Sequence, residues 1–193
     1  MQITNTRALR ALAHPLRLDL IELLGAGGPA TAAECARRLG TSQASCSFHL
    51  RQLAKYGFVE EAQSSGDRRE RPWQLTELEQ RWSSETPGAE HLERVFVGRE
   101  ADRILAWRAR AADDAESWRE GAFLGGVTLP LTSAELADVR QRLRAVLDPY
   151  VDRLGDRSAW PRDARLVRVL LSGTPLDDSA ESDEGEEIEH VDG

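Results

Sequence analysis

The chain has 193 residues, of which 40% are hydrophobic and 30% charged, and its formal net charge is −8. No stretch approaches the roughly 18 consecutive apolar residues of a membrane span, and the N-terminus lacks the apolar segment of a signal peptide. These features exclude a membrane protein and favour an ordinary globular one, so we expect a cytoplasmic location with no membrane partner.

The negative charge is unevenly distributed along the chain. Residues 1–81 contain 11 Lys and Arg against 9 Asp and Glu, whereas residues 82–193 contain 14 against 24. Nine of these carboxylates lie in residues 177–193, which have no Lys, Arg or aromatic residue. Such a segment buries too little apolar area to offset its ordering entropy, so we predict a disordered acidic tail there.

Four helices are predicted between the N-terminus and Tyr56. Thr4 or Asn5 can cap the first, which runs to about Ala13, and Pro15 begins the second. The third helix is opened by Thr31 with Glu34 three positions later, which is the capping-box pattern. The fourth is capped by Ser42 and has apolar residues at positions i, i+4 and i+7.

The hydrophobic period then changes from helical to alternating. Residues 57–63 and 68–76 are short extended segments joined by the turn-forming residues 64–67, so they predict a β-hairpin. Arg68, Arg69 and Arg71 lie at its tip. Residues 1–82 are therefore predicted to form one domain, with a further helical turn or two at residues 77–82.

A second domain is predicted over residues 83–176, and we interpret it as a dimerisation module that could also carry an effector site. It combines a long helix at residues 89–112 with an amphipathic helix that begins with the capping box of Thr132 and Glu135. Residues 122–131 and 165–172 are strand candidates that could pair. The predicted fold class is thus mainly α with small β elements (α+β), ending in the tail at residues 177–193.

The third and fourth helices predict a helix-turn-helix. Ala36 supplies the small residue where the helices cross, and Gly40 permits the tight turn. The polar start of the fourth helix suits entry into a major groove, and the basic hairpin tip suits neighbouring phosphates. The candidate residues for binding double-stranded DNA are Thr41, Ser42, Gln43, Ala44, Ser45, Ser47, His49, Arg51, Lys55, Arg68, Arg69 and Arg71.

Three stretches resemble the winged helix-turn-helix of the ArsR-like bacterial transcription regulators, over a region that ends near position 80. They are "ALAHPLRLDLIELL" at residues 11–24, "GTSQASCSFHLRQLAKYGFVEE" at residues 40–61, and the Arg-rich hairpin that follows. The resemblance implies a homodimer that binds a palindromic operator and usually represses transcription. Many of these regulators bind metals through a Cys pair, but Thr31 and Ala33 occupy those positions here. We therefore expect no metal and no cofactor.

The two cysteines, Cys35 and Cys46, fall at positions of the helix-turn-helix core. We interpret them as packing residues, and a thiol redox switch is the alternative. His14 and His49 are likewise interpreted as packing residues, with a phosphate contact as the alternative for His49.

The tryptophans in the second half of the chain can be interpreted in two ways. Trp82, Trp107, Trp118 and Trp160 favour core packing, while a pocket for a small-molecule effector, formed by Trp107, Trp118 and Trp160, is the alternative. No catalytic constellation is present, so the sequence does not predict an enzyme. The rival to a DNA-binding regulator is a winged helix that binds another protein without specific DNA binding.

Overall fold

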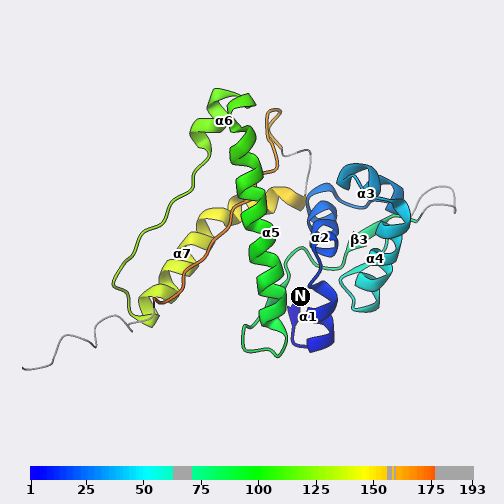
Figure 1. Ribbon diagram of the computed structural model, residues 1–193, viewed down its shortest axis with the longest axis horizontal. Helices are drawn as coiled ribbons and strands as arrows, with labels where there is room; N and C mark the ends of the chain where they lie inside the picture. Colours follow the sequence, from blue (N-terminus) through cyan, green and yellow to red (C-terminus); the bar gives the residue numbers. More distant parts are fainter. Residues whose placement is uncertain (63–70, 156–157, 159, 177–193) are drawn as a thin grey trace, which may run out of the picture. The chain divides into compact units, whose positions relative to one another are not determined.

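The computed structural model describes residues 1–62, 71–155, 158 and 160–176. They divide into two compact units, the first comprising residues 1–126 with the described part of 156–166, and the second residues 127–155 and 167–176. The domain boundary expected at residue 82 thus falls inside the first unit. Figure 1 labels the α-helices of the first unit and strand β3. In chain order, the elements of this unit are β1 Gln2–Ile3, α1 Thr6–Leu12, α2 Pro15–Gly27, α3 Ala32–Leu39, α4 Gln43–Lys55, β2 Val59–Glu61, β3 Trp73–Leu75, β4 Arg81–Trp82, α5 Ala89–Arg110, η1 Ala111–Asp113 and α6 Glu116–Gly121.

The first four helices begin where side chains satisfy free backbone N–H groups. Asn5 accepts a hydrogen bond from Arg7 N at the start of α1, and the imidazole of His14 accepts one from Leu16 N at the start of α2. Thr31 and Glu34 form the expected capping box of α3. Local sequence therefore fixes these helix starts, because each cap supplies an acceptor that the helix itself lacks.

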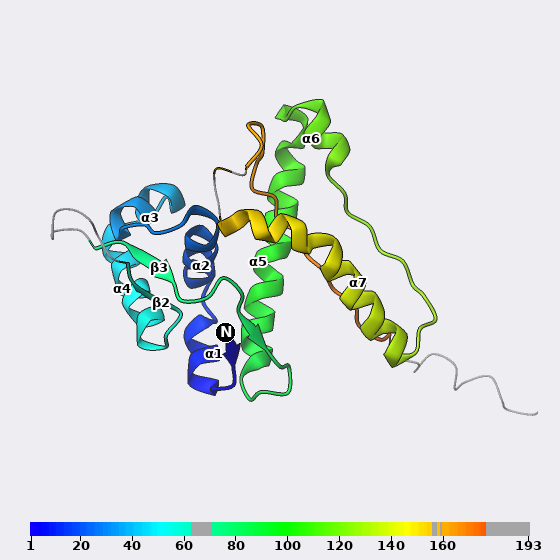
Figure 2. The same ribbon diagram turned by 180° about the vertical axis from the view of Figure 1, so that it is seen from behind.

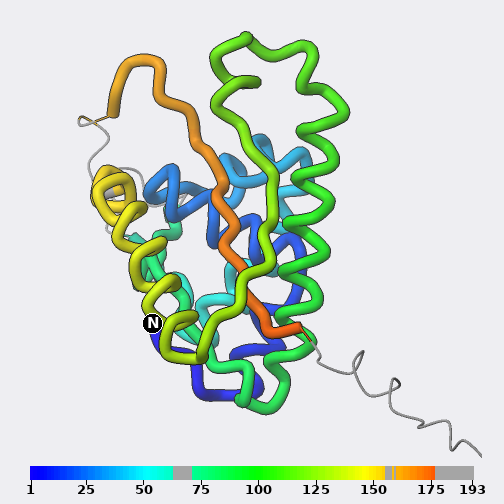
Figure 3. Tube along the Cα trace, turned by 90° about the vertical axis from the view of Figure 1, so that its left-hand side faces the viewer, coloured from blue at the N-terminus to red at the C-terminus, as the bar shows by residue number. Residues whose placement is uncertain are grey.

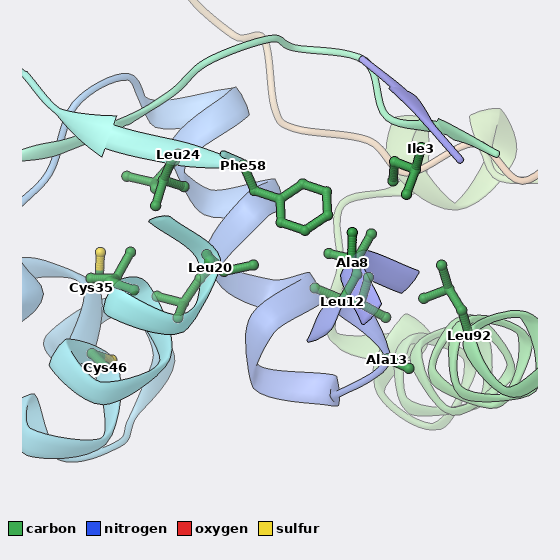
Figure 4. Close-up of a cluster of buried hydrophobic side chains, with 14 of the residues drawn as sticks. Ile3, Ala8, Leu12, Ala13, Leu20, Leu24, Cys35, Cys46, Phe58 and Leu92 are labelled. Atoms are coloured by element: carbon green, nitrogen blue, oxygen red, sulfur yellow. The ribbon is translucent and has the colours of Figure 1, made fainter. Parts of the chain in front are cut away.

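A single hydrophobic core joins α1 to α5 with the hairpin (Figure 4). Phe58, directly before β2, is fully buried between the side chains of α1 and α2. Leu92 brings the first turn of α5 against Ala8 and Leu12 of α1. The long helix α5 is therefore part of the same folded body as the helix-turn-helix.

The predicted hairpin forms, whereas the helical turn predicted at residues 77–82 does not. Strands β2 and β3 are antiparallel, with Val59 opposite Leu75 and Glu61 opposite Trp73. Residues 81–82 form the short strand β4, which pairs in parallel with β1 (Figure 2). Trp82 packs against the core and donates a hydrogen bond to Glu93 of α5. This burial of Trp82 beside the N-terminal strand outweighs the weak and short helical pattern of the segment.

Helix α5 is bound to α2 by a half-buried group of ion pairs. The guanidinium of Arg99 contacts Asp19 at 2.7 Å, Glu22 at 2.5 Å and Glu100 at 2.8 Å, and Arg103 contacts Glu22 at 2.9 Å. Glu100 is 1% exposed, so its carboxylate depends on these cations for compensation. Burial opposes ionisation of Glu22, but hydrogen bonds from Arg99 and Arg103 outweigh this effect and lower the pKa of Glu22 from its ordinary value.

The second unit contains α7 Ser133–Val151 and η2 Asp152–Gly155. The capping box of Thr132 and Glu135 opens α7 as predicted. The two strand candidates are wrong, because the described residues of 122–131 and 165–172 are extended without strand pairing (Figure 3). Pro130 removes one ladder donor and Gly125 with Gly126 weakens the strand preference of the first segment.

Replacing Arg99 with Met should lower the free energy of unfolding by about 3 kcal/mol, because Asp19, Glu22 and Glu100 lose their nearest cation. The loss should shrink as the pH falls through the lowered pKa of Glu22, since that contribution exists only while the carboxylate is ionised. Urea unfolding at several pH values measures both effects. Arg94→Met is the matched control, because Arg94 pairs with Glu90 on the exposed face of α5 and should change stability by less than about 0.5 kcal/mol. Equal losses in the two variants would contradict this role of Arg99.

Candidate nucleic-acid interface

The turn between α3 and α4 depends on Gly40. Its φ of 63° and ψ of 34° place it in the left-handed region, which favours glycine. The N–H groups of Gly40 and Thr41 both donate to the carbonyl of Ala36, and Ala36 itself is buried at the helix crossing. The crossing and turn residues predicted from the sequence thus occupy the expected positions of a helix-turn-helix.

Helix α4 has one buried edge and one exposed face. Cys46, Leu50 and Leu53 are fully buried, at the predicted spacing. The exposed side chains are those of Ser42, Gln43, Ala44, Phe48, Arg51 and Lys55, while Thr41, Ser45, Ser47 and His49 are half-buried. Because three apolar anchors fix the rotation of α4 about its axis, the polar and basic residues form the outward face.

The electrostatics of α4 favour a negatively charged ligand. Its residues include no Asp or Glu, and the first turn has no acidic side chain. The Ser42 hydroxyl accepts from Ser45 N, which leaves the positive end of the helix dipole at the exposed residues Gln43 and Ala44. Arg51 donates to the carbonyl of Ser47 and is held along the exposed face. This combination of amides and basic side chains suits phosphate contacts beside a groove.

His49 lies toward the interior rather than on the outward face. Its ring stacks on that of His14 at a centroid distance of 4.4 Å, and its Nδ1 is buried with no hydrogen-bond partner among the described residues. Burial and the nearby charges of His14 and Arg17 lower the pKa of His49, and burial with Arg17 lowers the pKa of His14 despite Asp19. Both imidazoles are therefore neutral at pH 7, which agrees with the packing interpretation.

The hairpin places Arg71 beside the acidic end of β2. Its guanidinium pairs with Glu61 at 2.5 Å on the exposed side of β2 and β3, and Gln74 donates to Glu60. Arg71 thus neutralises the charge of a carboxylate on the hairpin. Arg68 and Arg69, the other two residues of the predicted basic tip, lie outside the described residues.

Sequence reasoning missed three exposed residues of α3 and α4. Phe48 is 53% exposed on the outward face of α4, between Ala44 and Arg51. Arg37 and Arg38 are exposed in the last turn of α3, beside the turn of Gly40. The helical period could have shown Phe48, because it follows Ala44 by four positions and precedes Arg51 by three.

The two cysteines are free and fully buried in α3 and α4. Burial raises the pKa of Cys35 to about 11 and also raises the pKa of Cys46, so both are protonated thiols at pH 7. Among the described residues, no three His, Cys, Asp or Glu side chains come together in a group that could hold a metal ion.

The tryptophans of the second half have polar or cationic neighbours. Trp118 lies under the guanidinium of Arg165 at 4.7 Å from its ring centroid, and Arg165 also pairs with Asp114 at 2.7 Å. Trp107 and Trp160 are half-buried. A hollow on the long helix is lined by other residues, namely Pro15, Arg94, Val95, Gly98, Arg99 and Asp102.

Comparison with known families supports the helix-turn-helix. A family model described as a helix-turn-helix domain matches residues 12–62, which span α2 to β2. The comparison with curated proteins gave no match. None of the helices in the described part of the chain combines the length and apolarity needed to cross a bilayer.

Solved structures that match this chain include transcription regulators at low identity. One is a transcriptional regulator homologue from Pyrococcus horikoshii, with 20% identity, a TM-score of 0.34, and coverage of 49% of this chain and 86% of that one. Another is the homodimeric winged helix-turn-helix DNA-binding domain from Mycobacterium bovis, described as a possible ArsR-family regulator. It has 19% identity and a TM-score of 0.32, and the match covers 54% of this chain and 81% of that one. A third is a transcriptional regulator from Thermotoga maritima, with 17% identity, a TM-score of 0.32, and coverage of 72% of this chain and 79% of that one.

The turn geometry, the hairpin and the family match together define a helix-turn-helix domain. This domain spans residues 12–62, and a further helical region follows the hairpin.

Acidification should destabilise the protein through the two imidazoles. A histidine whose pKa is lowered by folding stabilises the folded state only above its unfolded pKa, and this contribution is lost as the pH falls through the lowered value. We expect the free energy of unfolding to fall between pH 7.5 and 5.5, and His49→Gln to reduce that fall. Chemical denaturation at each pH is the measurement. His91→Gln, an exposed position on α5, is the control and should keep the wild-type pH dependence.

Cys35 and Cys46 should resist thiol reagents in the folded protein at pH 7, because burial keeps both in the protonated form. Labelling with iodoacetamide, followed by mass spectrometry, should show modification at least about 100-fold slower than in denaturant. Rapid labelling of the native chain would instead favour the redox-switch alternative.

Proposed function

We propose that this protein represses transcription by binding as a homodimer to a palindromic operator. The observation that carries the proposal is the outward face of α4, which is free of acidic residues and presents Gln43, Ala44, Arg51 and Lys55 beside an exposed helix N-terminus. In this proposal α4 enters the major groove and the hairpin contacts phosphates on its flank.

The two ends of α4 have different roles in the proposal. Gln43 and Ser45 in the first turn contact base edges, because short polar side chains there let the helix approach the groove closely. Arg51 and Lys55, further along the helix, contact phosphates and fix the register. Hydroxyl contacts to the backbone come from Thr41, Ser42 and Ser47. His49 supports α4 from within instead of contacting DNA.

The homodimer follows from the ArsR-like pattern and sets the form of the operator. A two-fold dimer places two copies of α4 in major grooves separated by about one helical turn, roughly 34 Å, so the half-sites form a palindrome. Binding over a promoter would block access of the polymerase. A small-molecule effector remains part of the proposal for Trp107, Trp118 and Trp160, whose surroundings carry the charges of Arg165 and Asp114.

Selection from a randomised DNA library with the purified full chain tests the proposal directly. Enrichment of a palindrome with half-sites about 10 base pairs apart supports an operator-binding dimer. Enrichment of a single half-site contradicts the dimer but keeps DNA binding. No enrichment at low salt contradicts DNA recognition and favours the protein-binding winged helix.

Replacing Arg68 and Arg69 with Ala should weaken binding to every DNA sequence and flatten the dependence of affinity on salt by about one phosphate contact for each residue. Gln43→Ala should instead relax the preference at one base position of each half-site and leave the salt dependence unchanged. Fluorescence anisotropy over a range of salt concentrations separates the two effects. The control is Arg94→Ala on α5, where a basic residue is removed from a surface outside the proposed interface. Unchanged affinity in both test variants would contradict the assignment.

A further inference from the structure

The second unit has no core of its own among its described residues. No side chain of α7 or η2 is buried, and the buried hydrophobic residues of the described chain end at Leu92. Eleven large hydrophobic side chains of this unit are exposed: Val127, Leu129, Leu131, Leu143, Val146, Tyr150, Val151, Val167, Leu170, Leu171 and Leu176. A unit of about 40 residues is too small to enclose such side chains alone.

The apolar residues of α7 form one continuous seam. Leu136, Val139, Leu143, Val146 and Tyr150 are spaced by three and four positions in turn, which is the a/d pattern of helices that pack side by side. We call these five residues the α7 seam. One end is partly covered, because a Cβ at Gly173 would lie 3.3 Å from Leu136. Val139 is half-buried, and Leu143, Val146 and Tyr150 are exposed by 45%, 65% and 59%.

The extended segments of the unit offer unpaired strand edges. Apolar residues alternate at Val127, Leu129 and Leu131, and again at Val167, Val169 and Leu171. Within the described residues, no backbone–backbone hydrogen bond joins residues 127–131 or 169–176 to any other segment. The free backbone N–H and C=O groups of such a segment can be satisfied by pairing with another strand.

These observations favour a second copy of the same chain as the partner. The exposed fractions of the eleven side chains add up to about six fully exposed side chains, which is on the order of 1,000 Å² of exposed apolar area. This area is enough for a stable interface, which buries about 800 Å² per partner. The described residues of the unit carry four acidic and five basic side chains, so two copies meet without strong repulsion. A two-fold contact supplies each seam with an apolar face and each strand edge with a strand.

We propose that the second unit is a dimerisation interface, in which the α7 seam and residues 127–131 and 167–176 pair with the same elements of a second copy. The interface rests on the homodimer of the proposed function and names the surface that forms it. In the dimer, the extended segments become strands and α7 covers them. The apolar residues that alternate in residues 127–131 and 167–171 are then buried between the two chains.

Charging the α7 seam in the full chain tests the interface. The test variant carries Leu143→Asp and Val146→Asp, and the matched control carries Gln141→Asp and Ala145→Asp on the opposite face of the same helix. Analytical ultracentrifugation should show a dimer for the wild-type chain and the control. The test variant should dissociate with a Kd raised roughly 100-fold or more, because each copy would bury two unpaired carboxylates.

The control should match the wild-type chain in circular dichroism and thermal unfolding. The test variant should keep the helical circular dichroism signal, because neither Leu143 nor Val146 lies in the core. Hydrogen exchange provides an independent readout: residues 127–131 and 167–176 should be protected in the wild-type dimer and lose that protection in the test variant. A test variant that stays dimeric with unchanged exchange overturns this interface alone and leaves the homodimeric repressor intact. A wild-type chain that is monomeric overturns both the interface and the dimer of the proposed function.

Discussion

The burial of Cys46, Leu50 and Leu53 fixes the rotation of α4, and the proposed DNA interface depends on it. These three side chains occupy one edge of a helix whose outward face is mostly polar, basic or small. Turning α4 by one residue would move its apolar edge by about 100° and place Arg51 against the core. The small volume of Cys46 suits this role, since α3 and α4 approach closely where Cys35 and Cys46 lie (Figure 4). Recognition chemistry at this surface is thus a consequence of packing on the opposite side of the helix.

Charge pairing extends that rigid body to α5. Arg99 and Arg103 neutralise Asp19 and Glu22 on α2 as well as the buried Glu100, so the long helix is held by both apolar and ionic contacts. His14 contributes from the other end of α2, because the same imidazole caps α2 and stacks on His49 of α4. A movement of α5 would therefore displace α2, and the core contacts of α2 support the proposed recognition helix.

The first unit was largely predictable because its signals are local. Asn5, Thr31 and Ser42 cap helices by accepting hydrogen bonds from residues two or three positions ahead, and Gly40 adopts a conformation that other residues rarely reach. Long-range packing explains what the sequence analysis missed there. Strands β1 and β4 pair although they lie far apart in the sequence, and Trp82 finds its place beside Glu93 and Phe96 only in the folded chain. In the second unit, alternation alone predicted strands where no pairing partner is available within the described chain.

The sequence by itself determined the helix starts, the turn at Gly40, the apolar edge of α4 and the identity of the helix-turn-helix, because each of these depends on residues close together in the chain. Only the tertiary structure decided that His49 faces His14, that Phe48 and the two arginines of α3 are exposed, and that α5 joins the first unit through Arg99. These outcomes depend on which distant side chains compete for the same buried space and the same charges. That competition has no signature in local spacing, since it is resolved only when the helices pack together.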